Sequence, residues 1–126
     1  MEFVFVYTLG AVLYGAAELL WRGWTHWTML LCGGLCFFLM YLISSAPLPL
    51  WRKWVLSSAV ITAVEFETGI VVNLLLGWDV WDYSDMPVNL LGQICPEFSL
   101  CWLLLSVPGI ALCALIRSLF LRRWRA

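Results

Sequence analysis

The sequence predicts an all-α fold: a polytopic membrane protein with four transmembrane helices and a short helical or re-entrant segment before the last span. Hydrophobic residues make up 63% of the 126 residues and charged residues 12%, and the mean hydropathy is +0.93. Soluble globular domains do not reach these values. A helix needs roughly 20 apolar residues to cross the hydrocarbon core, and four stretches approach that length: 3–21, 27–44, 54–77 and 99–121. Because little chain remains outside them, we expect residues 1–126 to form a single transmembrane domain.

The boundaries of the four spans follow from the residues that flank them. We expect 3–21 to be a retained span rather than a signal peptide, because no basic leader precedes it and its only early charge is Glu2. The second span must end near Ser44, since Pro47 and Pro49 follow and proline cannot continue a helix. The third span ends before the polar segment 78–98, and the fourth leads into a basic C-terminus.

The basic residues indicate how the spans are oriented, because Lys and Arg in short loops stay in the cytoplasm. Arg52 and Lys53 lie between spans two and three, and further arginines follow span four. The segment 78–98 holds acids and no basic residue. All of the nine tryptophans except Trp102 fall at predicted span ends, as an interfacial belt requires. We therefore expect both termini to be cytoplasmic.

Polar residues of the third span recur at spacings of four, three, four and four, so they share one face of a helix. They are Ser58, Thr62, Glu65, Gly69 and Asn73. Hydrocarbon offers no hydrogen-bond partners, so such a face belongs against protein or a water-filled path. A charged side chain at the centre of a membrane helix costs about 2.5–3.5 kcal/mol on insertion scales. Glu65 is therefore the leading candidate for a functional residue, with Asn73 further along the same polar path.

Glu67 is a second intramembrane acid and needs a different partner. It follows Glu65 by two positions and so projects about 200° away around a helix of 3.6 residues per turn. Its own face is otherwise apolar. A carboxyl group there is protonated, hidden against another helix, or buried between two protomers. A four-helix unit cannot easily bury both sides of its third span. This favours a homodimer in which Glu67 is an interface candidate.

Glu18 and Arg22 in the first span are the best candidates for charges near the outer boundary. They are four apart, in the acid-first order that suits an ion pair on a helix. Two interpretations stay open. The pair neutralises itself at the interface, or Arg22 also reaches the outer acids or an anionic ligand.

Other sequence features favour neither a cofactor nor a metal site. His26 is a lone histidine between tryptophans, and no second histidine or cysteine pair stands at the spacing of zinc ligands. The motifs that would identify a hydrolase, a metalloprotease or a dinucleotide enzyme are missing, as is a P-loop. Any coupling to ATP must therefore come from a separate nucleotide-binding subunit. A net charge of −1 gives no support to a nucleic-acid partner.

Several short motifs lie between residues 65 and 102. They are Glu65-x-x-x-Gly69, Trp81-Asp82-Tyr83-Ser84, Pro87-x-Asn89-x-x-Gly92-Gln93-Ile94-Cys95 and Ser99-x-x-Trp102. Together they resemble the core of the bacterial ABC-transporter type IV membrane family. The resemblance implies a permease-like protein of the bacterial inner membrane. The family label fixes neither substrate nor mechanism.

The same segment has a physical interpretation of its own. Proline is tolerated in the first turn of a helix, so Pro87 can begin a short helix that carries Asn89 and Gln93, and Pro96 then stops it. The segment either lies flat at the outer surface or dips back among the helices. We expect an outward-facing vestibule above Glu65 and Asn73, and its lining residues are Glu18, Arg22, Tyr83, Asn89 and Gln93.

Three classes of function remain open at this point. The first is a small transporter or channel in which Glu65 is a proton-titratable or cation-binding site. The second is a membrane subunit or regulator that assembles with another protein, such as a separate ATPase. The third is an intramembrane enzyme acting on lipid, with Glu65 as base and Arg22 holding a phosphate. The third lacks a recognisable nucleophile, so we expect no enzyme.

Overall fold

The computed structural model describes residues 1–125. Its four long apolar helices confirm the predicted fold class. Helix α1 spans Glu2–Arg22, α2 spans Trp27–Ser44, α3 spans Leu50–Gly69 and α4 spans Pro96–Arg125, and a π-helical turn, η1, continues α3 over Ile70–Leu75. Within residues 1–125, extended pairing is limited to one bridge, between Leu90 and Ile94.

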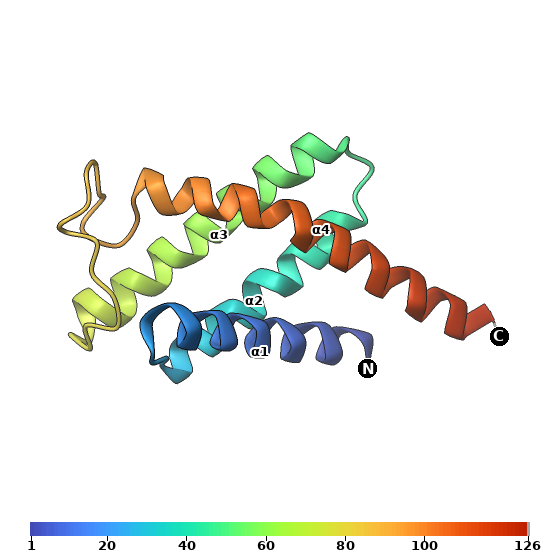
Figure 1. Ribbon diagram of the computed structural model, residues 1–126, viewed down its shortest axis with the longest axis horizontal. Coiled ribbons are helices and arrows are strands. Elements are labelled where there is room, and N and C mark those ends of the chain that lie inside the picture. The colour runs from blue at the N-terminus through green and yellow to red at the C-terminus, as the bar shows by residue number, and fades with distance from the viewer. Residues whose placement is uncertain (126) are drawn as a thin grey trace.

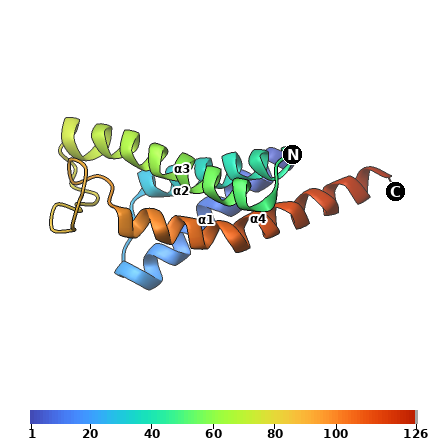
Figure 2. The same ribbon diagram turned by 90° about the horizontal axis from the view of Figure 1, so that it is seen from above.

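The helices run up and down, so that alternate connections lie at the same end of the bundle. Both termini and the connection 45–49 lie at one end, and the turn 23–26 and the segment 76–95 lie at the opposite end (Figure 1). The C-terminal part of α4 extends past the other helices in both views (Figures 1 and 2). This arrangement agrees with an even number of spans. Following the predicted orientation, we call the end that carries residues 76–95 the outer end, and these residues the outer segment.

Local residue chemistry explains where the helices begin and end. Gly23 closes α1 with φ 79°, a left-handed conformation that glycine adopts without steric cost. His26 then caps α2 by accepting a hydrogen bond from the Thr28 backbone N–H. Helix α3 starts at Leu50, directly after Pro49, rather than at 54. Pro96 does not end a helix as expected; it is the first residue of α4, where its missing N–H costs no hydrogen bond.

Glycines bring α1 and α2 close together. A Cβ added at Gly33 would overlap the side chain of Tyr14, and one added at Gly34 would meet the ring of Tyr7. Gly10 receives Phe37 of α2 in the same way. Lipid tails are as apolar as leucine, so membrane helices associate mainly through close packing and interhelical hydrogen bonds. The Gly33-Gly34 pair therefore supplies close contact rather than a kink.

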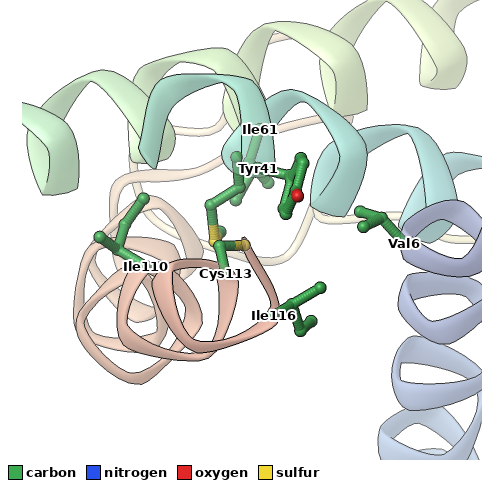
Figure 3. Packing of buried hydrophobic residues seen from close by; sticks show 7 residues of the cluster. Val6, Tyr41, Ile61, Ile110, Cys113 and Ile116 are labelled. Carbon is green, nitrogen blue, oxygen red and sulfur yellow. The ribbon is translucent and has the colours of Figure 1, made fainter. Parts of the chain in front are cut away.

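The buried apolar residues form two clusters at different depths. The larger one, toward the inner end, joins all four helices, and Figure 3 shows its side chains converging between α2 and α4. Its buried members are Val6, Met40, Tyr41, Ile61, Ile110, Cys113 and Ile116. The smaller cluster lies beneath the outer segment. It consists of Met29, Val72, Val80 and Trp81, with Tyr14 and Tyr83 packed against it. Along α3 the inner cluster and the first polar residues overlap, since Ile61 belongs to the cluster and Ser58 precedes it.

Candidate functional site

Glu65 is the buried acid of the bundle and both of its carboxylate oxygens are used. It is 8% exposed. The Tyr83 hydroxyl donates to Oε1 at 2.8 Å, and the indole N–H of Trp102 donates to Oε2, also at 2.8 Å. One carboxylate thus connects α3 to the outer segment and to α4. Charge-assisted hydrogen bonds of this kind are roughly twice as strong as neutral ones, which offsets part of the cost of burying the acid.

Tyr83 is positioned for this bond by its neighbours. Its ring stacks on Phe98 of α4, with centroids 4.7 Å apart and an interplanar angle of 14°. Its backbone N–H donates to the Gly92 carbonyl at 2.7 Å. Burial raises the pKa of the Tyr83 phenol well above its usual range, and the nearby Glu65 carboxylate raises that pKa further. Tyr83 therefore stays protonated and remains a donor to Glu65.

Asn73 lies in the π-helical turn and connects that turn to the outer segment. Its Nδ2 donates to Oε1 of Gln93 at 2.7 Å, and its Oδ1 accepts from the backbone N–H of Val80 at 2.7 Å. The indole of Trp81 in turn donates to the Gln93 carbonyl at 3.0 Å. Asn73 and Gln93 are 6% and 2% exposed, respectively. π-turns are rare and are found frequently at functional sites; here the wide turn directs Asn73 toward residues 80–93.

Gly69 lies one turn below Asn73 and leaves room for this packing. A Cβ at this position would come within 2.5 Å of Gln93 Oε1 and 3.0 Å of the Trp81 ring. The outer segment can therefore approach α3 closely only because residue 69 has no side chain. Gly69 is a packing residue for Gln93.

Glu18 and Arg22 form the expected ion pair, with Arg22 Nε 2.6 Å from Glu18 Oε2. The structure adds a second contact, because Arg22 Nη1 donates to the Val80 carbonyl at 3.1 Å. The guanidinium also lies over the Trp24 ring, 4.2 Å from its centroid. Arg22 thus neutralises Glu18 and at the same time attaches α1 to the outer segment.

Asn89 is not brought together with the other predicted site residues. Its amide donates to the carbonyls of Ser84 and Met86, and its Oδ1 accepts from the Gly92 N–H at 2.9 Å. It therefore stabilises the turn that it belongs to. Of the two forms expected for this segment, residues 76–95 take turns instead of a short helix, with left-handed backbone at Val88, Leu91 and Gly92. Asn89 and Gln93 consequently form hydrogen bonds with different residues.

The remaining polar residues of the α3 face connect it to α4. Ser58 donates to the Ser99 carbonyl at 2.9 Å, and the hydroxyls of Thr62 and Ser99 lie 3.1 Å apart. A groove of about 540 Å³ runs beside these contacts between α3 and α4. Its lining is mostly apolar and does not include Glu65 or Asn73. The polar face of α3 is thus occupied by contacts with α4 toward its inner part and with residues 76–95 toward its outer part.

Glu67 is exposed on the opposite side of α3. Neighbouring side chains on its face include Ala63, which is also exposed, and Val71, which is 49% exposed. This agrees with the sequence argument that Glu67 needs a different partner from Glu65.

Sequence reasoning missed two donors of the site. Both tryptophans, Trp81 and Trp102, appear in the motifs that resemble the family, but neither is predicted to donate a hydrogen bond in the site. Trp81 is instead assigned to the interfacial belt, although it is 6% exposed. A tryptophan inside a span, away from both membrane interfaces, is a signal that its N–H has a partner on another helix. The Val80 backbone contacts could not be found from residue types at all.

Comparison with known families agrees with this architecture. The profile of the family described as "Putative ABC-transporter type IV" matches residues 2–125, which is nearly the whole chain. No curated protein and no solved structure matches the chain. Several residues of the motifs between 65 and 102 that suggested this family take part in the contacts around Glu65 and Gln93, namely Gly69, Trp81, Tyr83 and Trp102. The chain is a member of the ABC-transporter type IV family of membrane proteins.

Proposed function

We propose that this membrane protein has a transport function in which Glu65 is the proton-titratable group of a polar path through Glu65 and Asn73. The observation that carries the proposal is the pair of hydrogen bonds at Glu65, one from the outer segment and one from α4. Intramembrane carboxylates held in this way are costly and mark proton relays and ion pathways in pumps and transporters. The family to which the chain belongs supports a transport-related role.

In this mechanism the outer segment covers the path, and the protonation state of Glu65 determines whether that segment stays in place. An ionised Glu65 accepts from Tyr83 and Trp102 and keeps the segment against α3. A protonated carboxyl group is uncharged and one of its oxygens becomes a donor, so the bonds from Tyr83 and Trp102 lose their charge assistance and weaken. Protonation from the outside therefore loosens Tyr83, and the segment then uncovers Asn73 and Gln93. The proposal involves no enzymatic reaction and no cofactor.

The test is proton flux in liposomes that contain the purified full-length protein. A potassium diffusion potential drives protons inward while an internal dye reports pH. We expect pH-dependent flux from the wild type, and none from Glu65→Gln, which cannot titrate. Glu97→Gln is the matched control, because Glu97 is exposed at the start of α4 and makes no contact with the path. Equal flux from wild type and Glu65→Gln would refute the proposal.

The second candidate function is a membrane subunit that assembles with another chain. One observation favours it: Glu67 is exposed at membrane depth, where an uncovered carboxylate costs about 2.5–3.5 kcal/mol. Covering it requires another copy of this chain, as in the predicted homodimer, or a different subunit such as a nucleotide-binding partner. Cysteine cross-linking from position 63 in native membranes distinguishes the two, because a homodimer yields a species of twice the chain mass. Both termini are cytoplasmic in this proposal, on the face of the bacterial inner membrane where an ATPase would bind.

A further inference from the structure

Two basic side chains from different helices meet at the last turn of α2. Lys53 of α3 donates from Nζ to the Ser44 carbonyl at 2.8 Å, and Arg117 of α4 donates from Nη2 to the Tyr41 carbonyl at 2.6 Å. The Ser44 hydroxyl donates to the same Tyr41 carbonyl at 2.6 Å. The carbonyls at a helix C-terminus carry a partial negative charge, so both cations are held at this turn. We call Lys53 and Arg117 the inner cation pair.

The inner cation pair lies at a boundary of the membrane. Helix α2 has 18 residues, which at about 1.5 Å each give about 27 Å, close to the roughly 30 Å thickness of the hydrocarbon core. The connection 45–49 follows directly, and both chain termini lie at the same end (Figure 1). The last turn of α2 is therefore at the level where hydrocarbon gives way to lipid headgroups.

The charges of the pair are not neutralised by an acid. Among the described residues the one ion pair is that of Glu18 and Arg22, at the other end of the bundle. Glu2 is the acid at the inner end of the described chain, and it accepts from the Tyr41 hydroxyl. Arg117 lies over the ring of Tyr41, with its Cζ 4.2 Å from the centroid. Further basic residues at this end are Arg52, Arg122 and Arg123.

Two buried nitrogen donors at this end have no acceptor within the described part of the chain. They are Nε of Arg117 and the indole Nε1 of Trp54. Trp54 follows Lys53 on α3 and packs against the larger, inner cluster, which contains Tyr41. A buried donor without an acceptor is costly. Both side chains are partly exposed as a whole, so an acceptor from outside the chain can reach them.

We infer that the inner cation pair binds the phosphate group of an anionic phospholipid. A phosphate supplies the acceptor oxygens that Arg117 lacks, and arginine forms strong, charge-assisted hydrogen bonds with phosphate. The Lys53 ammonium has three donors, and Ser44 accepts from one of them. The two acceptor residues on α2 are three positions apart, about 4.5 Å along the axis, so one headgroup can contact both cations.

The surroundings of the pair favour a lipid over a soluble anion. Apolar side chains of α3 and α4 are exposed next to it in the sequence; they are Val55, Leu56, Leu115 and Leu119. Acyl chains can lie along these side chains while the attached phosphate reaches the two cations. The indole N–H of Trp54 then has the polar layer of the lipid within reach, as is usual for tryptophan at a membrane interface. A bound headgroup would connect α2, α3 and α4 at their inner ends.

The test is thermal unfolding of the full-length protein in detergent at physiological ionic strength, with phosphatidylglycerol or zwitterionic phosphatidylcholine added. We expect phosphatidylglycerol to raise the melting temperature saturably and phosphatidylcholine to raise it less, because a ligand that binds the folded state stabilises it. Arg117→Gln should weaken the apparent affinity for phosphatidylglycerol about tenfold or more, and Lys53→Gln about fivefold. Proton flux plays no part in this measurement, so its outcome is independent of the transport proposal.

Arg123→Gln is the matched control, because it removes one positive charge from an exposed position at the same end. Its affinity should stay within about twofold of the wild type, since exposed charges are screened by salt. The melting temperature in phosphatidylcholine reports whether each variant folds, and only the additional rise with phosphatidylglycerol reports binding. Lys53→Gln tests the site without changing the contacts of Arg117.

Three results would overturn the inference. In the first, phosphatidylglycerol stabilises the wild type no more than phosphatidylcholine does, which would leave the cations for another partner such as an acidic protein segment. In the second, Arg117→Gln, Lys53→Gln and Arg123→Gln lose affinity equally, which would reduce the effect to overall positive charge. In the third, inorganic phosphate raises the melting temperature as much as phosphatidylglycerol does, which would assign the donors to a soluble anion.

Discussion

The interface between α1 and α2 and the interface between α3 and α4 are held together by different interactions. Helices α1 and α2 fit mainly through shape, with Tyr7 and Tyr14 resting on Gly34 and Gly33. Two hydrogen bonds flank this packing: the Tyr7 hydroxyl donates to the Leu31 carbonyl, and the Tyr41 hydroxyl donates to Glu2 near the inner end of α1. Helices α3 and α4 are joined by hydrogen bonds among Ser58, Ser99, Glu65 and Trp102. The buried carboxylate, Glu65, belongs to the second interface. Under the proposed function, the first interface is therefore structural and the second is the one that changes with protonation.

The largest effect on stability should come from filling the shape-based interface. Gly33→Leu would place its side chain in the volume of Tyr14, and overpacking of this kind costs about 3 kcal/mol at the upper end of its usual range. Unfolding in detergent, followed by circular dichroism, measures the change. Ala17→Leu adds bulk at an exposed position of α1 and should leave stability unchanged. Equal stability of Gly33→Leu and wild type would show that α1 and α2 do not pack as described.

A smaller effect on stability is expected from Asn73→Leu, which removes hydrogen bonds between the π-helical turn and residues 76–95. This change leaves the Val80 N–H without an acceptor and Gln93 Oε1 without a donor, and an unsatisfied buried group costs about 1–3 kcal/mol. We expect a loss of about 2 kcal/mol and faster hydrogen exchange in residues 76–95, while α1 and α2 keep wild-type exchange. Asn89→Ala breaks bonds within its own turn only and should cost less. Slowed or unchanged exchange in 76–95 would contradict the role given to Asn73.

The smallest effect is that of Tyr83→Phe, which removes one hydrogen bond worth about 1 kcal/mol. It also tests a pH dependence. The pKa of Tyr83 in the folded protein lies above its ordinary value of 10.0, so the unfolded chain loses this proton first as pH rises. Stability from Tyr83 is therefore fully present below pH 10 and falls above it. Above pH 10, the melting temperature should fall less with rising pH for Tyr83→Phe than for the wild type. An identical fall in both proteins would refute this contribution of Tyr83.

Different levels of the structure were predictable from the sequence to different extents. Apolar length set the four helices, and the spacing of Glu65, Gly69 and Asn73 identified the buried face of α3. The partners of that face were only partly predictable. Gln93 and Tyr83 were placed above it, but Asn89 was grouped with them because a helix was expected where turns form. Trp102 and the Val80 backbone were missed, since contacts between distant residues depend on how the outer segment folds back.

The helix ends show a similar limit. Pro96 signals a helix boundary, and it begins α4 where a helix end was expected; proline is compatible with both sides of a boundary. Glu67 remains a prediction about a partner chain.

The most direct test of the central claim is an infrared titration of Glu65 in lipid. The account predicts a carboxyl stretching band that appears as pH falls, that disappears in Glu65→Gln but not in Glu97→Gln, and that follows the same pH dependence as proton flux. A protein in which no such band belongs to Glu65 over the pH range where flux changes would contradict it. In that case Glu65 would be a fixed structural acceptor for Tyr83 and Trp102.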